Sequence, residues 1–135
     1  MLKAYIAGPL RDSHEFLIAA NRNRAYQEAC RLWKSGFAVL CPHLNTLNMI
    51  GLLEEEKTFI AGDLEWLRHA DIAIFLADWE NSEGAVLERD FCYRYQIPIL
   101  EAPNTKIDAY ISAKDGYEYS YKQIELIAEG ELPLP

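Results

Sequence analysis

The sequence predicts an α/β fold: a single doubly wound, Rossmann- or flavodoxin-like domain with helices on both faces of a mostly parallel sheet of four to five strands. Short apolar runs alternate along the chain with longer segments of helical periodicity. The run IAIFLA at 72–77 is apolar throughout, which is typical of a strand buried inside a parallel sheet. No repeat, linker or low-complexity segment divides the 135 residues, so we expect one domain over residues 1–135.

The first half of the chain predicts two strands joined by a long helix. The apolar run LKAYIA at 2–7 ends at Gly8-Pro9, as a buried strand followed by a loop does. Residues 14–34 have helical periodicity, Ser35-Gly36 ends that helix, and FAVLC at 37–41 predicts the second strand. The core positions expected on this helix are Phe16, Leu17, Ala20, Ala25, Ala29 and Leu32.

The second half of the chain continues the alternation. A polar loop is expected from His43 to about Gly51, followed by a helix over 54–69 and the strand over 72–77. The later expected elements are a helix over 82–95, a strand over 97–100, a short strand over 117–119 and a helix over 121–129. Ligands bind such sheets at the carboxyl ends of the strands. The loops expected there are 8–13, 42–53, 78–83 and 101–116.

Charge and cysteine content narrow the classes of partner. The net charge is −8, the pI is near 4.8 and no Lys/Arg run exists, which excludes a long nucleic acid but not a single small phosphate. No apolar run is long enough to cross a membrane, and the first seven residues are too short for a signal peptide. Cys30, Cys41 and Cys92 are widely spaced in apolar runs, which favours free buried thiols in a reducing compartment. We therefore expect a cytoplasmic protein that binds a small molecule and uses neither a cofactor nor a metal.

Two acidic residues fall on helix faces that are otherwise apolar. At about 100° per residue, Glu88 lies in the middle of such a stripe on the helix over 82–95, and Asp63 lies in one on the helix over 54–69. On the helix over 82–95 the other members of the stripe are Gly84, Leu87, Phe91, Cys92 and Tyr95. On the helix over 54–69 they are Phe59, Ile60, Leu64, Trp66 and Leu67.

Inward carboxylates require a partner or a shifted pKa. One such acid is most simply paired with an arginine or with backbone N–H groups. Two of them, on helices that flank the same strand, favour a functional site. Paired carboxyl groups suit glycosidic-bond cleavage, in which one attacks the anomeric carbon and the other helps the leaving group to depart as an acid.

Two turns near strand ends offer positions for an anion. Ser82 is a typical N-cap, and Gly84 lies on the same face as Glu88, one turn earlier, where it leaves space above the acid. The first turn of this helix presents N–H groups to an anion, and the segment Gly8-Pro9-Leu10-Arg11 adds a fixed positive charge. Taken alone, these features are an ordinary turn and a surface arginine.

The combined motifs resemble the nucleoside 2-deoxyribosyltransferase family over about residues 3–100. The matching segments are YIAGPLR at 5–11, DLEWLRHAD at 63–71, the strand over 72–77 and SEGAVLE at 82–88. The closest branch is the deoxynucleoside 5′-monophosphate N-glycosidases. The spelling W-x-x-S-x-G-A-x-x-E from Trp79 to Glu88 also resembles a group of short phage and bacterial proteins without a settled activity.

This resemblance implies specific roles. Glu88 would attack C1′ of the deoxyribose, Asp63 would contact the base and assist its departure, and Tyr5 would lie beside the nucleophile. The residues implied in holding a 5′-phosphate are Gly8, Pro9, Leu10, Arg11, Ser82 and Gly84. Pro9 stands where the branch usually has a serine, which removes a hydroxyl and an N–H group, and Val86 stands where it often has a glycine. The family forms dimers or larger assemblies, so the resemblance also implies a homodimer or larger homo-oligomer.

We therefore expect an N-glycoside hydrolase or deoxyribosyltransferase that acts on a small nucleoside or nucleoside 5′-monophosphate. The alternative is a nucleotide-binding or interaction module without turnover. A phosphoacceptor receiver-like domain is disfavoured, because it requires acidic residues where this chain has Gly8-Pro9. We expect His43 to satisfy a local hydrogen bond and Asp71 to anchor a turn, while Trp79 could stack on a base or pack against a subunit.

Overall fold

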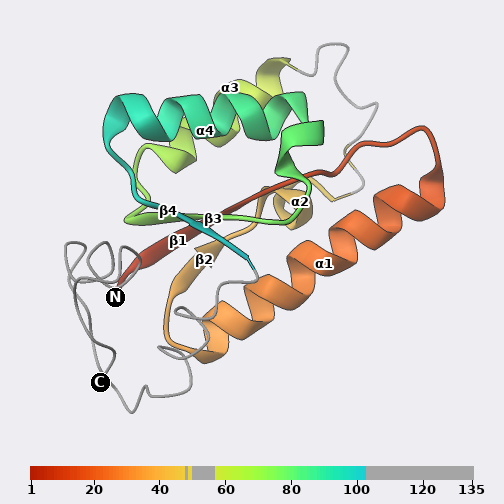
Figure 1. The fold of residues 1–135 in the computed structure, drawn as a ribbon. Coiled ribbons are helices and arrows are strands. Elements are labelled where there is room, and N and C mark those ends of the chain that lie inside the picture. Colours follow the sequence, from red (N-terminus) through yellow and green to blue (C-terminus); the bar gives the residue numbers. More distant parts are fainter. Residues whose placement is uncertain (48, 50–56, 103–135) are drawn as a thin grey trace.

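The computed structural model describes residues 1–47, 49 and 57–102, and the fold class predicted from the sequence is confirmed (Figure 1). Four parallel strands form one sheet in the order β2-β1-β3-β4. Their bounds are Lys3–Ala7 for β1, Ala38–Leu40 for β2, Ile72–Phe75 for β3 and Ile99–Glu101 for β4. The expected elements over 117–119 and 121–129 lie outside the described residues.

The strand order reverses beside β1. Tyr5 pairs with Leu40 of β2 on one side and with Ala73 of β3 on the other. The chain therefore leaves β1 to build β2 on one side and crosses over to build β3 on the opposite side. Loops that follow two such strands diverge to opposite faces and leave a crevice at the carboxyl edge of the sheet.

The helices cover both faces of the sheet (Figure 1). Helix α1 (Glu15–Lys34) lies on one face, and α3 (Lys57–Leu67) and α4 (Glu83–Tyr95) lie on the other. Side chains alternate between the two faces along each strand. The core on the α1 side includes Ala4, Ile6, Ile72, Ile74, Ala25, Ala29 and Leu32. The core on the α3 and α4 side includes Tyr5, Ala7, Ala73, Phe75, Leu67, Ala85 and Cys92.

Only the second half of α1 reaches the core. Ala25, Ala29 and Leu32 are buried as predicted, but the prediction was wrong for the three earlier positions, Phe16, Leu17 and Ala20, which are exposed. Figure 1 shows the reason: the first turns of α1 extend past the end of the sheet, so their apolar face has no strand to pack against.

Two predicted connections contain helical turns. The segment after β2 was expected to be a loop, but Pro42–Asn45 form the short helix α2, with a proline at its first position where the missing N–H is not needed. A 3₁₀ turn, η1 (Trp79–Asn81), precedes α4 and begins after Asp78, whose φ of 65° lies in the left-handed region.

The apolar stripes of α3 and α4 are narrower than predicted. Trp66, Leu87 and Tyr95 were expected to face inward, but their side chains are 58%, 49% and 53% exposed. A helix contacts a flat sheet along a thin line, so residues at the margin of a six-residue stripe remain at the surface. Tyr95 stacks on Phe91 instead, with ring centroids 4.3 Å apart.

Asp71 anchors the start of β3, as predicted. Its carboxylate accepts a hydrogen bond of 2.7 Å from the backbone N–H of Lys3 and lies 3.6 Å from the ammonium group of the same residue. The bond ties the start of β3 to the start of β1, which helps to set the register of the two central strands. Among the described residues, none of the helices is both long and apolar enough to span a bilayer.

Candidate active site

A cavity of about 410 Å³ opens at the carboxyl edge of the sheet. Its walls come from the segments after β1, β2 and β3 and from α3 and α4. The lining residues are Gly8, Leu10, Arg11, Pro42, His43, Thr46, Phe59, Ile60, Asp63, Asn81, Ser82, Glu83, Gly84, Ala85 and Glu88. The cavity therefore lies at the topological switch point, where the sequence pattern placed the ligand.

Seven of the nine residues singled out from the sequence line this cavity, and two do not. The lining residues are Gly8, Leu10, Arg11, Asp63, Ser82, Gly84 and Glu88. Pro9 is buried and is absent from the cavity wall. Tyr5 is 1% exposed and packs in the core beneath α3 and α4.

Glu88 extends from the second turn of α4 into the cavity and has one enclosed oxygen. Its Oε2 atom is buried and has no hydrogen-bond partner among the described residues. Burial, together with the charge of Asp63, raises the pKa of Glu88 to about 8, against the opposing effect of the neighbouring Tyr5 hydroxyl. Glu88 is therefore mostly protonated at neutral pH.

Asp63 reaches the same cavity from α3. Burial raises the pKa of its carboxyl group to about 6, so it is mostly ionised at neutral pH. Between about pH 6 and about pH 8 the pair Glu88–Asp63 therefore holds about one proton, and the charge of each group influences the pKa of the other. Two carboxyl groups that share one proton can supply a base or nucleophile and an acid in one site.

Tyr5 responds to both carboxyl groups. Burial raises the pKa of its phenol well above the usual value, and the charges of Glu88 and Asp63 raise it further. The phenol oxygen is buried without a regular hydrogen-bond partner in the described part of the chain. Tyr5 is thus a neutral hydroxyl beneath the acidic pair, with its O–H available to donate to Glu88.

The first turn of α4 forms one end of the cavity. Ser82 is the N-cap, as predicted, and its Oγ accepts a hydrogen bond of 3.2 Å from the N–H of Ala85. The N–H groups of Glu83 and Gly84 belong to the first turn, which has no acceptors within its own helix. A Cβ atom on Gly84 would lie no closer than 3.9 Å to another group, the Ser82 Oγ, so this position leaves open space in front of Glu88.

The segment after β1 forms the wall beside that helix end. A Cβ atom on Gly8 would lie 2.7 Å from the Leu76 Cβ, which explains why this position needs glycine. Leu10 and Arg11 follow and line the cavity, which brings a cationic side chain to the same cavity as Ser82 and Gly84. Helix N–H groups and a guanidinium group suit a phosphate or another small anion.

Several lining residues were not singled out from the sequence. The sequence pattern placed the largest of them, Phe59 and Ile60, in the apolar stripe of a helix that faces the core. Nothing in the sequence pattern pointed to Thr46 or Asn81 as site residues. His43 is 5% exposed, and its Nε2 lies 3.2 Å from the Gly8 carbonyl oxygen and 3.1 Å from that of Pro9. His43 therefore satisfies hydrogen bonds as expected, but those of its Nε2 join it to the segment after β1 and not to its own neighbours in the sequence.

Trp79 packs within its own chain and is absent from the cavity wall. Its ring meets Phe75 edge to face, with centroids 5.8 Å apart, and the Arg89 guanidinium lies 4.3 Å from its centroid. Arg89 also lies 3.0 Å from a Glu101 carboxylate oxygen. This cluster joins η1, α4 and β4 and supports the turn that leads to Ser82. No cluster of three potential metal ligands occurs among the described side chains.

A solved structure of similar fold belongs to an enzyme. It is described as a 2-deoxyribosyltransferase from the psychrotolerant bacterium Bacillus psychrosaccharolyticus and superposes with a TM-score of 0.58. The two sequences are 20% identical, and the match covers 91% of this chain and 90% of the other. The likeness shows that this chain has the nucleoside 2-deoxyribosyltransferase-like fold.

Comparison at the level of sequence gives one family. No curated protein matches the chain. Residues 2–101 match a family model described as a domain of unknown function, DUF4406. The match spans β1 to β4 and includes every residue of the cavity wall. This chain is therefore a member of the DUF4406 family.

Proposed function

We propose that this protein cleaves the N-glycosidic bond of a small deoxynucleoside, nucleoside or nucleoside 5′-monophosphate. One observation carries the proposal: Glu88 and Asp63, on separate helices, line the same cavity at the switch point of the sheet. The similar fold of a 2-deoxyribosyltransferase supports the same class of reaction. The cavity volume of about 410 Å³ is within the range for small-molecule sites.

In the proposed reaction, Glu88 is the nucleophile and Asp63 is the acid. A Glu88 carboxylate oxygen forms a bond to C1′ as the bond from C1′ to the base nitrogen breaks, and the bonding electrons leave with the base. Asp63 donates a proton to the base, which leaves as a neutral molecule. In the second step water attacks C1′, the bond from C1′ to the Glu88 oxygen breaks, and the Asp63 carboxylate accepts the proton of the water. In base exchange, a second base attacks C1′ in place of the water.

The reaction requires a redistribution of the shared proton. Before a substrate binds, the proton resides mainly on Glu88, because its pKa of about 8 exceeds the value of about 6 for Asp63. Attack requires the opposite arrangement, an ionised Glu88 and a protonated Asp63. The Tyr5 hydroxyl favours the ionised form of Glu88 and thereby assists the exchange. The total charge of the pair stays the same, so both arrangements exist over the same pH range.

The wall opposite the base would hold the 5′ end of the substrate. Arg11, Ser82 and Gly84 line it together with the first-turn N–H groups of α4. Leu10 also lines the cavity, whereas Pro9 is buried outside its wall. This arrangement favours a substrate with a phosphate or hydroxyl at C5′.

Release of free base is the test of this function. The protein is incubated with ribo- and deoxynucleosides and their 5′-monophosphates, with and without a second base as acceptor, and the products are separated by chromatography. We expect the wild type to release or exchange the base and Glu88→Ala to lose at least about a thousandfold in rate. Glu80→Gln, an exposed acid in η1, is the matched control and keeps the wild-type rate.

The outcomes separate the enzyme from a binding module. Base release by both the wild type and Glu88→Ala would remove Glu88 from the mechanism. No release from any substrate, even with an acceptor base, would contradict glycosidic cleavage and favour a protein that binds a nucleotide without turnover.

A further inference from the structure

We propose that Asn21 and His43 form a clamp that holds three consecutive backbone carbonyl groups after β1 and thereby sets the affinity of the cavity for its substrate. The inference rests on the proposed function, because the substrate is the one assigned there. Neither residue needs to contact the reacting atoms. Both are positioning residues for Leu10 and Arg11, which line the cavity.

The sheet stops supporting this segment at Ala7. The last ladder bond runs from the Leu76 N–H to the Ala7 carbonyl oxygen, at 2.8 Å. Beyond it, the next three carbonyl groups bond to side chains from other elements. His43 Nε2 lies 3.2 Å from the Gly8 oxygen and 3.1 Å from the Pro9 oxygen.

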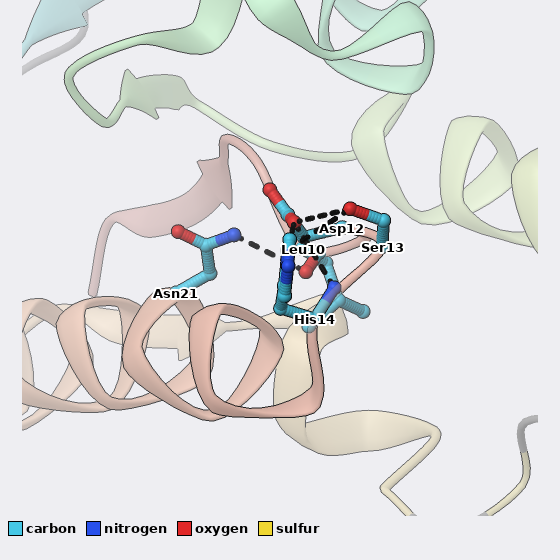
Figure 2. Close-up of polar contacts among 5 residues, drawn as sticks. All are labelled: Leu10, Asp12, Ser13, His14 and Asn21. Atoms are coloured by element: carbon cyan, nitrogen blue, oxygen red, sulfur yellow. Dashed lines mark hydrogen bonds and ion pairs between the residues drawn. The ribbon is translucent and has the colours of Figure 1, made fainter.

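Asn21 holds the third carbonyl group. Its Nδ2 donates a hydrogen bond of 3.2 Å to the Leu10 oxygen, and Figure 2 shows the side chain extending from α1 toward that group. Arg24 fixes the orientation of the amide, because its Nη2 donates a bond of 3.0 Å to Asn21 Oδ1. The Arg24 guanidinium also lies 3.9 Å from the Asp78 carboxylate, in the turn after β3.

The end of the segment is fixed by a local turn. The Asp12 carboxylate accepts bonds of 3.1 Å from the His14 N–H and 3.3 Å from the Ser13 hydroxyl, directly before α1 (Figure 2). Leu10 and Arg11 thus lie between the clamp and this turn. A trans peptide directs its N–H away from its carbonyl oxygen. Anchoring the Pro9 and Leu10 oxygens on His43 and Asn21 therefore also sets the directions of the Leu10 and Arg11 N–H groups.

Asn21, unlike His43, lies outside the wall of the cavity that contains the acidic pair. Asn21 belongs to α1, on one face of the sheet, whereas Glu88 and Asp63 belong to α4 and α3, on the other (Figure 1). Loosening the clamp should therefore weaken substrate binding while the carboxyl groups stay in place. This predicts a change in KM with little change in kcat.

Asn21→Asp tests the clamp with minimal change in shape. The carboxylate keeps the contact with Arg24 but cannot donate to the Leu10 oxygen, and its charge opposes that oxygen. Asn23→Asp is the matched control, since Asn23 is exposed on the same helix and gains the same charge. Amide hydrogen exchange is measured by mass spectrometry over residues 8–13 in both variants, and KM and kcat are measured with the best substrate of the panel.

We expect Asn21→Asp to exchange at least about threefold faster over residues 8–13 and to raise KM about tenfold, with kcat within about twofold of the wild type. Asn23→Asp should match the wild type in each measurement. Unchanged exchange over residues 8–13 would overturn the clamp. Faster exchange with an unchanged KM would overturn its role in affinity, whether or not kcat falls.

The clamp and the proposed function fail in different ways. If the wild type cleaves no nucleoside, the proposed function is wrong, and hydrogen exchange still decides whether Asn21 holds the segment. In that case the affinity arm uses nucleoside 5′-monophosphate binding by calorimetry, and equal affinity of Asn21→Asp and the wild type, or no binding to either, would overturn the clamp's role in affinity.

Discussion

The role proposed for Glu88 sets two requirements against each other. A nucleophile has to be ionised, but the Oε2 atom of Glu88 is buried without a hydrogen-bond partner in the described structure. Burial is the first cause that disfavours the charged form and raises the pKa from its ordinary value of 4.5 to about 8. A carboxyl oxygen that is buried without a partner is unfavourable for folding, and such a group in a cavity is typical of functional sites, which supports the proposal.

Replacement of Glu88 by glutamine should stabilise the protein increasingly as the pH rises. The folded form binds the proton of Glu88 more tightly than the unfolded form does. The contribution of this group to stability is therefore complete below its unfolded pKa of 4.5 and is lost as the pH rises through about 8. Glu88→Gln stays neutral at every pH. We expect its advantage in unfolding free energy over the wild type to grow by at least about 2 kcal/mol between about pH 5 and pH 9.

Urea unfolding followed by circular dichroism at several pH values measures this difference. Both proteins contain His43, so its contribution largely cancels in the comparison, whereas the charge of Asp63 acts through its coupling to Glu88 and forms part of the measured difference. Glu80→Gln, which changes an exposed acid, is the control. A difference for Glu88→Gln that stays constant with pH would mean that Glu88 is not protonated in the folded protein at neutral pH.

The helices show what the periodicity of a sequence can and cannot predict. The 100° projection placed Asp63 and Glu88 on inward faces, and both line the cavity. The same projection was wrong for Trp66 and Leu87, which lie at the margins of their stripes. Periodicity gives the direction of a face, whereas its buried width depends on how the helix meets the sheet and its neighbours, which is a tertiary property.

We expect a methyl group at position 84 to leave the first turn of α4 intact but to hinder binding of the substrate. In Gly84→Ala the new Cβ would lie 3.9 Å from the Ser82 Oγ, so it causes no strain, and alanine is the better helix former. It would instead occupy space in front of Glu88. We expect an unchanged or raised Tm and an increase in KM on the order of tenfold or more, measured by thermal unfolding and by base release.

Gly62→Ala is the matched control for this element. A Cβ at Gly62 of α3 has no neighbouring atom within 4 Å, so the substitution gives the same gain in helix propensity away from the cavity. It should raise Tm without a change in KM. If Gly84→Ala also left KM unchanged, the substrate would not lie over the first turn of α4.

At the scale of the whole molecule, the cavity depends on the strand order more than on any single motif. The sequence pattern predicted four to five strands, the order of the described ones along the chain and the edge of the sheet at which a ligand is expected. It gave no reason to place His43 against Gly8, because that contact requires β2 to pair beside β1 and α2 to form after it. The role of Asn21 was equally hidden, since an asparagine in a long helix is ordinary until the chain folds and Leu10 lies beside it.

Because the cavity joins segments from both faces of the sheet, a bound ligand should stabilise the whole fold. Glu88→Gln is suited to this test, since it keeps the shape of the site but lacks the proposed nucleophile. At a hundredfold excess over Kd, a ligand that binds the folded state adds about 2.7 kcal/mol to the unfolding free energy, which for a chain of this length raises Tm by several degrees.

We expect nucleoside 5′-monophosphates to produce this rise in Tm in Glu88→Gln, and inorganic phosphate or the free base alone to produce a much smaller one. Adding Gly84→Ala to this variant should reduce the added stability at the same ligand concentration to about 1.4 kcal/mol or less, because its methyl group fills space that the ligand needs and a tenfold weaker affinity leaves only a tenfold excess over Kd. If Gly84→Ala left the shift unchanged, the nucleotide would be stabilising the protein from a surface other than this cavity.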